Sequence, residues 1–114
     1  MSDNVFLVIG LGSFGRQCCE ELAARGAKVI AVDNIAEHID RIKDSVTQAF
    51  LIDSTDELQL KGLPIEDIDM AIIAIGDNIE SNILTTALLK QAGVPYIIAR
   101  ASTELHNKVL KQVG

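Results

Sequence analysis

Residues 5–15 of the chain read VFLVIGLGSFG, an apolar run that leads directly into three glycines spaced G-x-G-x-x-G. An amphipathic pattern follows, so this stretch predicts a strand, a tight turn and a helix. In such a turn Gly10 permits the sharp bend, Gly12 lets the backbone approach a pyrophosphate, and Gly15 lets the helix pack against the strand. The helix N-terminus then presents N–H groups and a positive dipole end to an anion.

A carboxylate closes the next apolar run. Residues 28–33 read KVIAVD, and Asp33 follows Gly15 at close to the spacing at which an acid accepts hydrogen bonds from a ribose diol. The glycines and Asp33 together predict a nucleotide site. The alternative is a packing turn with a solvated acid beside it.

The composition is that of one aliphatic domain. A chain of 114 residues with 48% hydrophobic residues can bury a core, and we expect residues 1–114 to form a single domain. The net charge is −6 and no basic run is present, which argues against a nucleic-acid partner. The longest apolar stretch, residues 70–75, is too short to cross a bilayer. Asp3 and Asn4 stand where a signal peptide carries positive charge, so we expect a cytoplasmic protein.

The cysteines and histidines predict neither a disulfide nor a metal site. Cys18 and Cys19 are adjacent within a predicted helix, where neighbouring side chains diverge. We interpret both as reduced core thiols. His38 and His106 are far apart in the sequence and lie on predicted helices, so neither joins a ligand set.

Strand and helix patterns alternate along the whole chain, which predicts a parallel sheet with helices on both faces. The expected fold is a doubly wound α/β sheet of Rossmann type with strand order 3-2-1-4-5 and no sixth strand. The predicted strands are residues 5–9, 28–32, 47–52, 70–75 and 96–99. The predicted helices include residues 13–25, 56–61, a long helix ending near 92, and 103–113.

Three helices are predicted to begin with a capping box, in which a polar residue is followed three positions later by Glu. The pairs are Asn34 with Glu37, Ser54 with Glu57, and Asp77 with Glu80. The buried face of the long helix is predicted to comprise Ile79, Ile83, Leu84, Ala87 and Leu88.

Polar and small residues follow several predicted strands, at the edge where a ligand crevice is expected. Asp53 can accept from an adenine amino group or lie beside the ribose, and Gly76 lets a ribose or phosphate come close. Arg16 and Arg100 are candidate phosphate ligands, or else a solvated arginine and an ion-pair partner. Neighbouring loop positions complete the predicted cofactor-binding set: Ser13, Phe14, Asn34, Ser54, Thr55 and Ile75.

No catalytic constellation is evident in the sequence. Tyr96 is followed four residues later by Arg100, so the Tyr-x-x-x-Lys pair of many small reductases does not occur. The pattern also lacks a Ser-His-Asp set or paired carboxylates in a plausible pocket. We therefore interpret the chain as a binding module and not an enzyme.

Several segments together resemble the KTN/RCK (TrkA-N) family, the cytosolic nucleotide-binding regulatory domains of Trk/Ktr-type potassium uptake systems and potassium channels. They are VIGLGSFG at 8–15, AVD at 31–33, DST at 53–55, IAIG at 73–76, ARA at 99–101 and HNKVL at 106–110. The resemblance implies a lobe that binds NAD(H), ATP or ADP. It also implies a homodimer that assembles into a larger ring on a membrane-embedded potassium transporter or channel subunit, so that the domain is peripheral to the membrane.

The resemblance assigns phosphates to Gly10, Gly12 and Gly15, the ribose to Asp33, and the adenine side to Asp53 and Thr55. Ser13 departs from the pattern, since many relatives carry there an arginine implicated in sensing a terminal phosphate. Arg16 is the candidate substitute. The family lobe normally continues into a sixth strand, whereas this sequence ends at Gly114.

The function expected from the sequence is regulation of potassium transport by an adenine nucleotide. Two alternatives remain, the cofactor domain of an NAD-dependent oxidoreductase and an NAD-binding redox sensor with another partner. Open apolar positions and an edge strand near the end of the chain also favour self-association.

Overall fold

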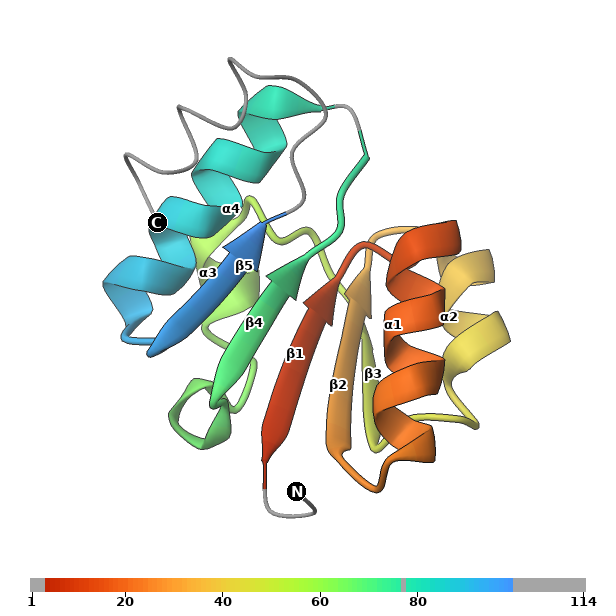
Figure 1. Ribbon diagram of the computed structural model, residues 1–114. Coiled ribbons are helices and arrows are strands. Elements are labelled where there is room, and N and C mark those ends of the chain that lie inside the picture. The colour runs from red at the N-terminus through yellow and green to blue at the C-terminus, as the bar shows by residue number, and fades with distance from the viewer. Residues whose placement is uncertain (1–3, 77, 100–114) are drawn as a thin grey trace.

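The computed structural model describes residues 4–76 and 78–99 (Figure 1). Its five strands form one parallel sheet in the order β3-β2-β1-β4-β5, which confirms the predicted fold class and strand order. The strands are β1 (Val5–Ile9), β2 (Lys28–Asp33), β3 (Gln48–Leu51), β4 (Met70–Ile73) and β5 (Tyr96–Ala99). The helices are α1 (Ser13–Ala24), α2 (Ala36–Ile42), α3 (Glu57–Leu60) and α4 (Ile79–Ala92), with a 3₁₀ turn, η1 (Ile65–Asp67). The predicted helix at 103–113 lies outside the described residues.

Strand β1 is central and pairs with β2 on one side and β4 on the other. Leu7 aligns with Ile30 of β2 and with Ala71 of β4. Helices α1 and α2 cover one face of the sheet, and α3 and α4 cover the other (Figure 1). Leu7 packs in the apolar layer with Leu89 of α4, whereas Val8 packs in the opposite layer. Burial on both faces explains why these strands are apolar without alternation.

Helix starts differ from the predicted capping boxes. Helix α2 has Ile35 at its N-cap and no side-chain cap, so Asn34 does not cap it. Helix α3 is capped by Asp56, not Ser54, and the Asp56 carboxylate accepts from the backbone of the first turn. Helix α4 is capped by Asn78, which accepts from the backbone N–H of Ser81 at 2.9 Å. The predicted cap Asp77 lies outside the described residues. Before α3 and α4 the sequence offers several competent cap residues, and the path of the preceding loop selects among them.

The buried face of α4 was predicted only in part, since Ile83, Ala87 and Leu88 are half-buried and Leu88 packs against the core. The residues that it buries are Asn82, Thr85, Thr86 and Leu89. Ile79 and Leu84, which were predicted to be inside, are 38% and 43% exposed. The helix is therefore turned so that a largely polar stripe faces the protein.

Hydrogen bonds make this polar stripe stable inside. The Asn82 Nδ2 donates to the carbonyl oxygens of Ile75, Gly76 and Asn78 at 3.2, 3.3 and 2.9 Å. The hydroxyls of Ser54 and Thr85 lie 2.9 Å apart in a buried contact. Groups paired in this way avoid the desolvation cost of burial, whereas the Asn82 Oδ1 is buried without a hydrogen-bond partner among the described residues. The contacts tie α4 to the loops after β3 and β4.

The thiols of α1 are expected to be unreactive in the folded protein. Burial raises the pKa of Cys18, and it raises the pKa of Cys19 to about 12, with Cys18 and Glu20 adding to the effect. Because the thiolate is the nucleophile, a thiol with a pKa about four units above pH 8 is only about one part in ten thousand ionised. Iodoacetamide at pH 8 should therefore alkylate Cys19 slowly, with a rate that rises as the pH rises.

Mass spectrometry of the alkylated protein, with and without denaturant, measures this effect. Unfolding in urea should release both thiols to rapid modification. Rapid stoichiometric alkylation of Cys19 in the folded protein would contradict its placement in the core.

Candidate functional site

A cavity of about 380 Å³ opens at the carboxyl edge of the sheet, toward which the arrowheads in Figure 1 point. Its walls come from the segments that follow β1, β2, β3 and β4, with Ser81 of α4. Chain segments far apart in sequence meet here because the carboxyl ends of parallel strands share one edge. The predicted residues that line it are Gly10, Gly12, Ser13, Phe14, Asp33, Asn34, Asp53, Ser54, Thr55, Ile75 and Gly76. Gly15, which was predicted to bind phosphate, is not among the residues that line it, and Arg100 lies outside the described residues.

The three motif glycines differ in what surrounds them. Gly10 has a φ of +95°, and a Cβ there would meet the backbone of Ala74 at 2.8 Å. A Cβ on Gly15 would overlap the carbonyl oxygen of Gly10, so α1 can approach β1 only with glycine at this position. Gly12 has an ordinary φ of −68°, and a Cβ added there meets nothing within 4 Å. The fold requires Gly10 and Gly15, whereas it leaves open space at Gly12.

The start of α1 is suited to an anion. Gly12 is its N-cap, no side chain caps the helix, and its first turn carries no acidic residue. The first N–H groups of a helix lack an acceptor within the helix, and the positive end of the dipole lies beside them. Gly76, in the segment after β4 that also lines the cavity, likewise has open space where a Cβ would stand. The backbone is therefore accessible at both glycines.

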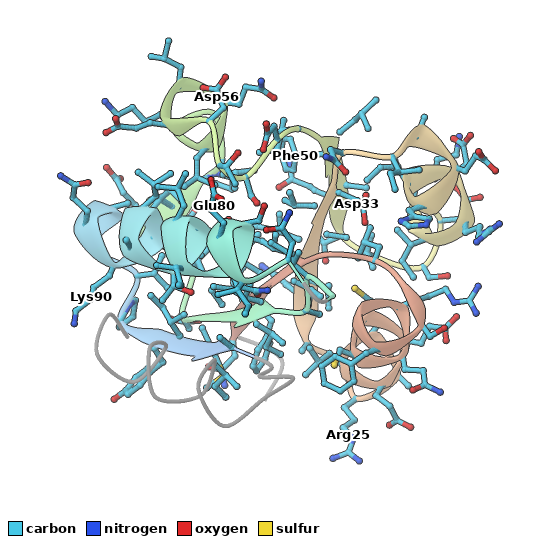
Figure 2. The ribbon with its side chains drawn as sticks, turned by 90° about the horizontal axis from the view of Figure 1, so that it is seen from above. Arg25, Asp33, Phe50, Asp56, Glu80 and Lys90 are labelled. Carbon is cyan, nitrogen blue, oxygen red and sulfur yellow. The ribbon has the colours of Figure 1, made fainter. Side chains whose placement is uncertain are left out.

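Asp33 occupies the wall between α1 and α2, as the labelled side chain in Figure 2 shows. Its side chain is only 7% exposed. One carboxylate oxygen, Oδ2, accepts from the backbone N–H of Leu11 at 2.6 Å and contacts the His38 Nδ1 at 3.0 Å. The other, Oδ1, accepts from the N–H of Ile35 at 2.8 Å. The acid therefore holds the glycine-rich turn and the start of α2 together, in addition to facing the cavity.

Asp53 and Thr55 form a local turn at the β3 wall. The Asp53 Oδ1 accepts from the Thr55 backbone at 2.9 Å and from its hydroxyl at 2.6 Å. These bonds lower the pKa of Asp53, the hydroxyl bond contributing most. Ser54 points inward to Thr85 and supports the loop.

The described lining carries acids and no lysine or arginine. Asp33 and Asp53 both face the cavity, and Arg16 is not among the residues around it. Phe14, a predicted cofactor-binding residue, lines the cavity and is 39% exposed. The positive potential that these described walls offer to an anion therefore comes from backbone N–H groups and the helix dipole.

Sequence reasoning missed several lining residues, of which His38 and Ser81 are polar. His38 lies on α2 near Asp33, and no motif marks it. The only signal available was that the helix after β2 must start at the crevice. Leu11, Ile35, Ile52 and Ala74 add apolar wall.

Two further properties concern residues 4–76 and 78–99. Their His, Cys, Asp and Glu side chains form no group of three able to hold a metal ion. Their helices include none with both the length and the apolar character needed to cross a bilayer.

The sequence is similar to that of known potassium uptake proteins. The chain is 41% identical over 109 residues to the Ktr system potassium uptake protein C of Bacillus subtilis (strain 168), covering 96% of this chain and 49% of the relative. It spans about half the length of the curated relatives it matches.

Two solved structures share the fold. The NAD(P)-binding domain of an exopolyphosphatase-related protein from Archaeoglobus fulgidus is 30% identical, with a TM-score of 0.85, covering 96% of this chain and 81% of that chain. The GsuK channel bound to NAD is 17% identical with a TM-score of 0.83, covering 97% of this chain and 20% of that one. The model of the TrkA-N domain matches residues 6–114. The chain belongs to the TrkA-N domain family.

Proposed function

We propose that this chain is a nucleotide-sensing lobe that regulates potassium transport, and that residues 1–114 form that one lobe. The observation that supports nucleotide binding concerns Gly12. The fold itself does not require glycine there, and the open space beside it adjoins the N-terminus of α1, which no side chain caps. The potassium part is supported by the Ktr relative. The lobe acts as a sensor and not as an enzyme.

Each part of the nucleotide is assigned to the cavity residues whose chemistry suits it. Phosphates lie at Gly10, Gly12 and Ser13, beside the first turn of α1. The adenine ribose lies at Asp33, with Asn34 next to it. The adenine lies toward the β3 wall at Asp53 and Thr55. The segment from Ile75 to Gly76 faces the rest of the nucleotide, and Arg100 remains a predicted phosphate ligand.

Among the candidate nucleotides, NAD(H) is favoured over ADP and ATP. Ser13 provides no cation, and the described lining contains two acids and no lysine or arginine. The negative charge of a terminal phosphate in ADP or ATP is therefore repelled by these two acids, and no cationic side chain of the described lining offsets the repulsion. The GsuK structure, whose fold this chain shares, is bound to NAD.

Calorimetric titration of the protein with NAD, NADH, ADP, ATP and NADPH tests the proposal. NAD(H) should bind most tightly, and NADPH should bind at least about tenfold more weakly than NADH because Asp33 repels a 2′-phosphate. Consumption of NADH in the presence of a small-molecule acceptor would instead support the oxidoreductase alternative. Absence of binding by all five would refute the nucleotide assignment.

The partner is a membrane-embedded potassium transporter or channel subunit, and the lobe lies at its cytoplasmic face as a homodimer within a larger ring. Exposed apolar side chains support self-association: Ile79 and Leu84 on α4, and Tyr96 and Ile98 on β5. Light scattering of the same samples, with and without nucleotide, gives the assembly mass. A mass of 12.3 kDa in both would contradict the homodimer.

A further inference from the structure

The hydrogen-bonding capacity of Asp33 is nearly used up before any ligand binds. A carboxylate offers about four acceptor sites, two on each oxygen. Oδ2 contacts two donors, the Leu11 N–H and the His38 Nδ1, and Oδ1 accepts from the Ile35 N–H. One acceptor site remains, on Oδ1.

A ribose has two hydroxyls to place at this wall. If Asp33 took both, one would have to displace a bond that the protein already makes. The Leu11 bond is short, at 2.6 Å, and buried, and the Ile35 bond fixes the entry to α2. Losing either would leave a backbone N–H without its partner, which is costly in a buried setting. A second acceptor near Asp33 removes this conflict.

His38 is placed to be that acceptor. It lines the cavity, and its side chain is 26% exposed. An ionised carboxylate only accepts hydrogen bonds, so the His38 ring donates from Nδ1 to Asp33 and presents Nε2 as its other polar atom. In the neutral ring Nε2 is an acceptor, and within the described part of the chain it has no hydrogen-bond partner. The contact with Asp33 fixes the ring orientation.

We propose that His38 is a ribose-binding residue, so that Asp33 Oδ1 receives one ribose hydroxyl and His38 Nε2 receives the other. This inference rests on the proposed nucleotide function and adds a specificity-determining residue to it. The affinity of the site therefore depends on the presence of both ribose hydroxyls. Each of the two hydroxyls has its own acceptor, on a different element of the fold.

The test compares ADP, 2′-deoxy-ADP and 3′-deoxy-ADP by calorimetry on the wild-type protein and on His38→Leu. The wild type should bind each deoxy probe about three- to tenfold more weakly than ADP, the effect of losing one hydrogen bond. In His38→Leu one of these two preferences should vanish, while the other, owed to Asp33, persists. His38→Ala gives the same comparison if leucine disturbs α2.

Asp40→Asn is the matched control, because Asp40 is exposed on the same helix and does not line the cavity. It should keep both preferences. Retention of both preferences in His38→Leu, with ADP still bound, would overturn the assignment of His38 and leave nucleotide binding standing. Failure of the wild type to bind NAD or any of the three probes would overturn both.

Discussion

Gly12→Val should abolish nucleotide binding while the protein keeps its fold and its melting temperature. A Cβ at this position meets no protein atom within 4 Å, so the branched side chain projects into the space beside the start of α1. The phosphates need that space to reach the backbone N–H groups. Loss of two charge-assisted hydrogen bonds weakens affinity by roughly 100-fold or more. Calorimetry with NAD and thermal unfolding followed by circular dichroism measure the two properties.

Gly15→Ala is the contrasting variant within the same motif. Its Cβ would overlap the carbonyl oxygen of Gly10, so α1 must move away from β1. We expect a loss of unfolding free energy of about 3 kcal/mol, typical of overpacking a tight contact. Unchanged NAD affinity in Gly12→Val would show that the glycine-rich turn serves packing alone.

Asp33→Ala should lower both nucleotide affinity and the free energy of unfolding. The carboxylate holds three donors, and its removal leaves the Leu11 and Ile35 N–H groups without that acceptor. The expected loss of stability is about 3 kcal/mol, and the expected loss of NAD affinity corresponds to about 1–3 kcal/mol. Urea unfolding measures stability, and affinity is measured at a temperature where the variant remains folded.

Asp53→Ala is a suitable control for this variant, because Asp53 is also a carboxylate at the cavity wall. Its side chain is exposed, and within residues 4–76 and 78–99 it bonds only to its neighbour Thr55. The urea midpoint of Asp53→Ala should stay near that of the parent. A similar midpoint for Asp33→Ala would contradict the role of Asp33 in joining the two loops.

The sequence was sufficient to predict the centre of the fold. Gly10 and Gly15 are sterically required, so their spacing after an apolar run determines how β1 enters α1. Continuous apolar strands separated by helices leave few arrangements other than a parallel sheet with right-handed crossovers. The order of strands and the position of Asp33 at the end of β2 follow from those two rules.

The orientation of α4 could not be predicted, because pattern analysis equates buried with apolar. Asn82 can be buried because its amide donates to carbonyl oxygens in the segment after β4. Thr85 can be buried because its hydroxyl bonds to the hydroxyl of Ser54. Those partners come together only after the strands pair. His38 was not predicted as a site residue for a related reason. Its place at the cavity depends on its contact with Asp33 across the start of α2, which the sequence pattern does not show.

The polar attachment of α4 has a mechanical consequence. Hydrogen bonds are directional, so a helix held by Asn82 and Thr85 cannot slide over its neighbours as an apolar face can. These bonds therefore couple the position of α4 to that of the two loops. The exposed side chains of Ile79 and Leu84 lie on the same helix. A shift of either loop would thus be passed to an apolar surface outside the crevice.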